Sequence, residues 1–284
     1  MEKGNDLSTN EKLLEADTDW FENKNTQRWI SAKGNQTELK EWLKKNYGTE
    51  EYCISQPFFF GIPEFTTQKP LIMVVGQETG LYGNIEELTS DTKEKIEKSQ
   101  NWVIEVTKYL HNENYNPSWK NYDNEEKNIY IKMTPFFRFI KELTKEYNVC
   151  WNNLDKIHYT AIIKSVRVDK DIKNAEQEIT ENKVVTLYDK DEKELFKPNG
   201  EGQSLLQKEI DIVKPTRIIF VTGPTYKKSI TYQMGNIFSN RKPDTDKNLI
   251  VMSDNKRYLW TYHPNYLSHS KNFDEVIKQI KDMK

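Results

Sequence analysis

Short, continuous runs of apolar residues constrain the fold of this 284-residue chain more than any other feature. The clearest run covers residues 71–75 (LIMVV), which Pro70 precedes and Gly76 follows. Further β-prone runs occur at 157–163, 217–222, 248–252 and 258–262, of which the last two either pair or form one interrupted final strand. A strand that is apolar at every position suits a sheet covered on both faces, because successive side chains point to opposite faces. The runs therefore predict a largely parallel sheet with a covered interior.

Amphipathic segments lie between these runs and predict helices. Residues 37–47 have apolar residues at helical spacing, with Thr37 as the N-cap and Gly48 just past the end. Helices are also expected at 92–110, 125–133, 135–147, 204–213, from about 225, and at 272–283. Strands that alternate with helices place helices on both faces of a sheet. We therefore predict an α/β fold, a three-layer αβα arrangement around a central, mostly parallel four-stranded sheet.

The distribution of charge along the chain guides the domain prediction. Residues 1–18 are polar and are expected to be flexible. Residues 19–284 are predicted to form a single α/β domain, since no internal repeat divides them and their length suffices for one large core. Within this domain, residues 169–202 are dominated by charge and glycine. We expect them to form an excursion that carries a hairpin at most.

Composition limits the classes of function. The net charge of −2 gives no overall basic field, so nucleic-acid binding needs a local basic face, for which 42 Lys and Arg are present. Two cysteines, Cys53 and Cys150, are too few for a structural zinc or iron–sulfur site and are predicted to be reduced buried thiols. The sequence has neither an apolar span of membrane length nor an apolar signal core. We expect a soluble, cytoplasmic monomer without metal or cofactor.

Polar residues and glycines follow the predicted strands at their carboxyl ends. They are Gly76-Gln77-Glu78, Lys164-Ser165, Gly223-Pro224 and His263-Pro264. Ligands of open α/β sheets bind outside these ends, and Pro264 forces the chain to turn directly after His263. We expect a carboxylate and an imidazole in one crevice, beside a helix start that can bind phosphate. This set suits cleavage of a glycosidic bond, in which histidine stabilises the leaving group and the carboxylate positions water.

The same residues resemble the motifs of the uracil-DNA glycosylase superfamily. Residues 76–80 (GQETG) are similar to its first motif, whose acidic residue handles the attacking water, and residues 263–268 (HPNYLS) are similar to its second, which is His-Pro-x-Tyr-Leu in some members. Residues 157–164 (IHYTAIIK) resemble a strand that usually reads Tyr-Ile-Thr-Asn-x-Val-Lys, and residues 214–223 resemble the strand before the phosphate-contacting helix. Pro135-Phe136 resembles the pair whose ring stacks on the flipped base. The order of the motifs over residues 70–284 also fits.

The resemblance implies a role for each matching residue. His263 would hydrogen-bond the departing base, and Glu78 would position the attacking water. Contacts with the base are implied for Gln77, Phe136, Ala161 and Asn265. Contacts with DNA, a duplex with one nucleotide flipped out, are implied for Lys164, Gly223, Thr225, Lys227, Lys228, Leu267 and Ser268. Among these, Leu267 would wedge into the duplex as the nucleotide leaves the stack.

Two departures from the family pattern predict a pocket for a bulky base. Position 161 is Ala, where the family usually has the Asn that reads the Watson–Crick edge of uracil. Thr79-Gly80 is smaller than the Pro-Tyr pair that excludes 5-substituted bases in the strictest uracil enzymes. The resemblance with these departures favours a DNA glycosylase for a modified base, such as the glucosylated hydroxymethylcytosine of phage DNA, in antiviral defence.

Other interpretations stay open beside this one. The first is a repair glycosylase for uracil or another deaminated base. The second is a member of the superfamily that binds DNA without cutting it, which a missing Asn would explain. The third is an unrelated α/β enzyme acting on free nucleosides or nucleotides. Single residues also have structural interpretations: His263 as a structural histidine, Glu78 as a helix cap, Phe136 as core and Leu267 as packing beneath its loop.

Overall fold

The structure is a computed structural model. It describes residues 7–24, 26–27, 37–54, 58–77, 92–112, 114–115, 117, 134–154, 159–169, 175–185, 203–245 and 248–283. For residues 37–39, 42, 47, 53–54, 159–169 and 175–185 only the backbone is described. Glu78, Thr79 and Gly80, together with the helix expected at 125–133, lie outside these ranges.

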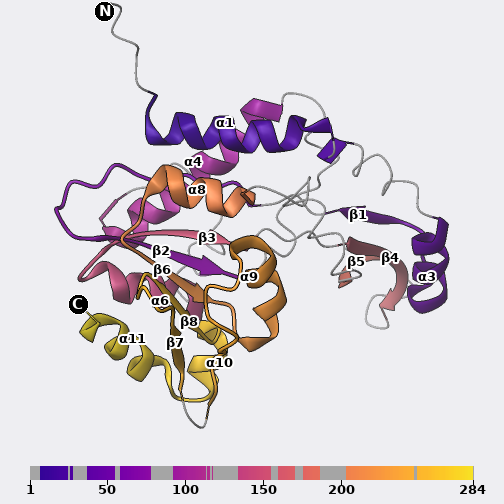
Figure 1. Ribbon diagram of the computed structural model, residues 1–284. Coiled ribbons are helices and arrows are strands. Elements are labelled where there is room, and N and C mark those ends of the chain that lie inside the picture. Colours follow the sequence, from indigo (N-terminus) through magenta and orange to yellow (C-terminus); the bar gives the residue numbers. More distant parts are fainter. Residues whose placement is uncertain are drawn as a thin grey trace, which may run out of the picture.

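A five-stranded sheet with the order β3-β2-β6-β8-β7 forms the centre of the protein (Figure 1). Its strands are β2 (Leu71–Gly76), β3 (Asn148–Asn153), β6 (Arg217–Val221), β7 (Ile250–Met252) and β8 (Tyr258–Thr261). The strands β3, β2, β6 and β8 are parallel, and β7 pairs antiparallel with β8 at one edge. The predicted α/β class and mostly parallel sheet are confirmed, but the prediction of four strands is wrong.

Strand β3 is the element that the sequence prediction missed. Helix α6 (Pro135–Thr144) ends three residues earlier than expected, and β3 begins at Asn148. The strand has only three apolar residues in succession, between asparagines that resemble loop residues. Asn148 is nevertheless buried, because its amide donates to the carbonyls of Thr67 and Lys69 at 2.9 and 3.0 Å. These partners are distant in sequence, so the pattern of β3 alone did not indicate a strand.

Residues 159–163, predicted as a strand of the central sheet, belong to a separate sheet. Strand β4 (Tyr159–Asp169) lies between β1 (Tyr52–Ile54) and β5 (Ala175–Val185), antiparallel to both. A run of apolar residues fits a small antiparallel sheet as well as a buried parallel one, which explains the wrong assignment. Strands β4 and β5 enter the excursion predicted at 169–202, of which residues 170–174 and 186–202 lie outside the described residues.

Helices pack against the sheet in two groups. Helix α6 contacts α10 (Pro264–His269), α11 (Phe273–Asp282) and β3, whereas α8 (Leu205–Val213) contacts α1 (Thr9–Glu22) and α9 (Lys227–Met234). Figure 1 shows α6 and α8 on opposite sides of the sheet. This arrangement is compatible with a three-layer αβα fold. Helix α4 (Thr92–His111) contacts both α1 and α6.

Helix α1 begins well before residue 18, the expected end of a flexible segment. Ser8 caps it with a capping box, since its hydroxyl accepts from the N–H of Glu11 and the Glu11 carboxylate accepts from the N–H of Ser8. Leu13, Trp20 and Phe21 then lie buried on one face. The segment from Thr9 onward is therefore part of the folded body. Helix α3 (Thr37–Tyr47) has the predicted bounds.

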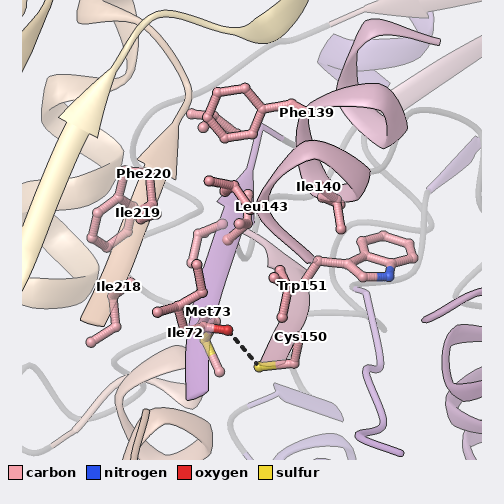
Figure 2. Close-up of a cluster of buried hydrophobic side chains, with 14 of the residues drawn as sticks. Ile72, Met73, Phe139, Ile140, Leu143, Cys150, Trp151, Ile218, Ile219 and Phe220 are labelled. Carbon is pink, nitrogen blue, oxygen red and sulfur yellow. Dashed lines mark hydrogen bonds between the residues drawn. The ribbon is translucent and has the colours of Figure 1, made fainter. Parts of the chain in front are cut away.

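One part of the core lies between α6 and the parallel strands. Figure 2 shows Phe139, Ile140 and Leu143 of α6 facing side chains of β2, β3 and β6. The thiol of Cys150 is buried there and donates to the carbonyl of Ile72 at 3.6 Å. Cys150 is a free thiol, so the prediction of a reduced buried thiol is confirmed for this residue. Burial raises its pKa to about 12.

Candidate functional site

The four parallel strands end at one edge of the central sheet, where polar residues gather. Gln77 follows β2, Asn153 ends β3, Thr222 and Gly223 follow β6, and Tyr262 and His263 follow β8. The register pairs Gly76 with Asn153, and the N–H of Leu154 donates to the carbonyl of Gln77 at 2.8 Å. The chain ends of β2 and β3 are thereby held side by side. This edge is where α/β sheets bind ligands.

Gly76 lets an amide and an aromatic ring approach the end of β2. A Cβ at this position would lie 2.2 Å from Asn153 Oδ1 and 3.0 Å from Phe136 Cε2. Contacts this short cannot exist, so any side chain here would displace Asn153 or Phe136. Phe136 comes from the first turn of α6 and also meets Trp151, with 5.8 Å between the ring centroids. The three residues thus form one compact group.

His263 is the N-cap of α10, and this position fixes its tautomer. The N–H of Asn265 donates to Nδ1 of His263 at 3.2 Å. Because Nδ1 accepts a hydrogen bond, the proton of the neutral ring lies on Nε2. In this tautomer Nε2 carries the N–H of the imidazole. Its plane is tilted by only 7° from that of Phe136, and the two ring centroids are 6.3 Å apart.

Gln77 and Gly223 connect the ends of β2 and β6. The amide of Gln77 donates to the carbonyl of Thr222 at 3.0 Å. Gly223 has φ +79°, a left-handed conformation that glycine adopts without strain, and a Cβ there would come within 3.9 Å of His263 N. Trp260 Nε1 donates to the Thr222 hydroxyl at 3.1 Å and to the Gly223 carbonyl at 3.2 Å. These bonds hold the turn beside His263 in place.

Asn153 is the site residue that sequence reasoning missed. Residues 157–164 were assigned to the central sheet, and on that basis Ala161 was expected where an Asn reads the base. That strand assignment is wrong: Ala161 pairs with Tyr52 and Lys183 in the three-stranded sheet. The central strand that ends beside Gly76 is β3, and its last residue is Asn153. An amide is thus present at the carboxyl edge after all.

Hydrogen bonds of the neighbouring Asn152 hold the backbone of Asn153 in place. The neighbouring Asn152 is fully buried, and its Nδ2 donates to Glu209 Oε2 of α8 at 2.9 Å. Its Oδ1 accepts from the N–H of Asn153 at 2.8 Å. Asn153 itself is half-buried, and its carboxamide has no hydrogen-bond partner within the part of the chain that the structure describes. The pair Asn152-Asn153 at the end of a short β-prone run is the signal that was overlooked.

The loop after His263 differs from expectation at Leu267. This side chain is fully buried in the core, so the structural interpretation, packing beneath the loop, describes it. Asn265 is exposed, and Ser268 is half-buried with a buried hydroxyl that has no partner among the described residues. In this conformation Leu267 cannot enter a DNA duplex.

The residues predicted to contact phosphate occupy different environments. The helical turn η3 (Pro224–Tyr226) leads from Gly223 into α9, with Thr225 and Lys228 exposed. Lys227 Nζ donates to the carbonyl of Asn240 at 3.0 Å, so it is directed toward the protein. Lys164 lies in β4, where its backbone pairs with Thr180, outside the central sheet. Phosphate binding by these residues stays a prediction.

No group of three or more His, Cys, Asp or Glu side chains within the described ranges could hold a metal ion. No described helix is both long and apolar enough to cross a membrane.

Comparisons with models of protein families, with curated proteins and with solved structures find no match to this chain. The likeness to the uracil-DNA glycosylase superfamily is therefore a likeness of short motifs. Any functional conclusion depends on what the residues at the carboxyl edge can do: a donor at His263, an amide at Asn153 and an aromatic ring at Phe136.

Proposed function

We propose that this protein is a DNA glycosylase that flips a base out of DNA and hydrolyses its N-glycosidic bond. The observation that carries the proposal is the Nε2–H donor of His263, fixed by Asn265, beside Phe136. A flipped base needs a surface for its face, polar groups for its edge and a donor for its developing charge. Phe136, Asn153 and His263 are suited to these three tasks in turn.

The chemistry assigned to these residues is a hydrolysis. The electron pair of the glycosidic bond passes to the base, while the sugar C1′ becomes electron-poor and bonds to a water oxygen. His263 Nε2–H donates to a base oxygen on which negative charge develops, which lowers the barrier because the donor is already oriented. Glu78, which the resemblance assigns to the water, accepts the water proton in this proposal and lies outside the described residues.

Asn153 changes the argument about the substrate. The case for a bulky modified base depended partly on the absence of an amide, and the case for a non-catalytic protein depended on it as well. A carboxamide presents one donor edge and one acceptor edge, and its flip is set by its partners. It can therefore pair with uracil in one orientation and with a cytosine derivative in the other. We propose a pyrimidine substrate, either uracil or a modified cytosine. The small Thr79-Gly80 turn favours the modified cytosine.

A base-release assay across DNA substrates tests the proposal and separates these bases. Wild type and Asn153→Asp are incubated with unmodified, uracil-containing, hydroxymethylcytosine and glucosylated DNA, and alkali then reveals abasic sites. We expect abasic sites in one kind of DNA, and roughly a hundredfold slower release by Asn153→Asp, because a carboxylate has no N–H donor. Asn112→Asp, at an exposed asparagine just after α4, is the matched control.

Two outcomes would contradict the proposal. Release of base from free nucleosides but from no DNA would indicate the unrelated α/β enzyme. DNA binding without release from any substrate would indicate a binding protein. Equal rates for wild type and Asn153→Asp would retain the glycosylase but remove Asn153 from base recognition.

A further inference from the structure

An exposed aromatic side chain lies next to the candidate site. Within the described residues, the exposed large hydrophobic side chains are Leu7 and Tyr266, which retain 38% and 44% of their accessible surface. Leu7 precedes the first helix, whereas Tyr266 lies in α10, three residues after His263. A single exposed aromatic residue is ordinary, so its role depends on how it is held.

Tyr266 is held in place by a second tyrosine. Its ring stacks on that of Tyr262, with 4.6 Å between centroids and 23° between planes. Tyr262 directly follows β8, is half-buried, and its hydroxyl donates to the carbonyl of Pro243 at 3.4 Å. Such stacking fixes the orientation of Tyr266. The pair brackets His263 in the chain and presents an oriented aromatic surface beside it.

Leu267 is also held firmly, but its side chain is buried in the protein and not exposed to solvent. Its side chain is fully buried, its N–H donates to the carbonyl of His263 at 3.1 Å, and its carbonyl accepts from Asn272 at 2.9 Å. Moving Leu267 outward would break the connection between α10 and α11. Tyr266 reaches solvent with none of these changes. The geometry of the loop therefore offers Tyr266 to a ligand and withholds Leu267.

We propose that the Tyr262–Tyr266 pair is a stacking site for a nucleobase of duplex DNA, and that Tyr266 rather than Leu267 fills the gap left by a flipped nucleotide. This inference rests on the proposed function. Aromatic rings stack on every base and accept any sequence, which suits a residue that replaces a missing neighbour. Lys271, exposed in the turn between α10 and α11, adds a positive charge suited to the flanking phosphates.

A binding experiment tests the proposed stacking role of Tyr266 without knowledge of the excised base. The probe is a duplex with a stable abasic-site analogue and a neighbouring 2-aminopurine, compared with the same strand unpaired. We expect Tyr266→Ala to weaken binding to the duplex about tenfold or more, with little change for the single strand. The 2-aminopurine signal that wild type quenches by stacking should return. Tyr266→Phe should behave as wild type, and so should Leu7→Ala, the control at the other exposed hydrophobic residue.

The results separate this inference from the proposed function. If wild type releases base from DNA and Tyr266→Ala binds the abasic duplex as tightly as wild type, the stacking site is wrong and the glycosylase stands. If Leu267→Ala, at unchanged folded fraction, causes the duplex-specific loss instead, Leu267 is the wedge. If wild type does not bind the duplex at all, both proposals fail.

Discussion

The two edges of the central sheet use their polar side chains in different ways. At the amino edge the Asn148 amide donates to two backbone carbonyls, and the Lys69 ammonium donates to the carbonyls of Thr144 and Lys145, each at 2.9 Å. At the carboxyl edge Asn153 and His263 are half-buried, with Asn153 Oδ1 directed at Gly76 and the imidazole ring of His263 nearly parallel to Phe136.

This difference separates stability from function. Side chains at the amino edge satisfy backbone groups and hold the strands in register, so their loss should lower the free energy of unfolding. Side chains at the carboxyl edge lie where α/β sheets bind ligands, so their loss should affect a ligand first. Variants at each edge therefore test whether stability and function depend on different side chains.

The largest expected effect on stability is at Asn148. Asn148→Ala removes two bonds to carbonyls and one from the Thr67 hydroxyl, which donates to Asn148 Oδ1 at 2.6 Å. At about 1 kcal/mol for each hydrogen bond, we expect a loss of about 3 kcal/mol in the free energy of unfolding. Urea unfolding measures it, with Asn112→Ala as the control. Loss of base release without loss of stability would contradict the division between the edges.

At the carboxyl edge the matching change is Gly76→Ala. The added Cβ would overlap Asn153 Oδ1, so the amide must move, while the rest of β2 keeps its register. We expect base release to slow about a hundredfold, the effect of misplacing a reacting partner by about 1 Å. The double variant with Asn153→Ala should be no slower than Asn153→Ala alone, since both act on one group. Additive losses would show that Gly76 acts elsewhere.

The smallest effect is a pH dependence at His111. Its Nε2 lies 3.1 Å from the N–H and 3.0 Å from the carbonyl of Val149 in β3, and it accepts from this N–H in the neutral tautomer that is protonated on Nδ1. Burial lowers the pKa of His111 below its usual 6.5. Because the folded state binds the proton more weakly than the unfolded state, the stability is complete above pH 6.5 and falls as the pH drops through the folded pKa.

Melting temperatures between pH 7.5 and 5 measure this dependence. His111→Gln keeps an acceptor for Val149 but does not titrate, so its melting temperature should fall less over this range than that of wild type. His269→Gln, at an exposed histidine, should melt as wild type does. Identical slopes for wild type and His111→Gln would rule out the histidine as the source.

Elements with a strong pattern were predictable from the sequence. The apolar runs of β2 and β6 and the amphipathic repeat of α3 were placed within a residue or two of their observed bounds. Pro264 marked the end of β8, so the position of His263 at the carboxyl edge was predictable as well. In each case local chemistry and tertiary packing agree.

The parts of the sequence prediction that were wrong depend on contacts with residues far along the chain. The asparagines of β3 are tolerated in a buried strand only because Thr67, Lys69 and Glu209 bond to them, and the sequence does not show these contacts. Because β3 was missed, the nearest apolar run, now β4, took its place and Ala161 was put in the site of Asn153. Likewise, whether Leu267 or Tyr266 points outward depends on how α10 packs against α6.

The most direct test of the account is base release by His263→Ser, because serine also caps a helix but lacks the imidazole donor. With the DNA that wild type cleaves, we expect release to slow about a hundredfold to a thousandfold, as on loss of one donor to a developing negative charge. His111→Gln, at the histidine that bonds to the amino end of β3, should cleave at the wild-type rate at pH 7.5. Equal rates for His263→Ser and wild type would contradict the central claim that the carboxyl edge performs the chemistry.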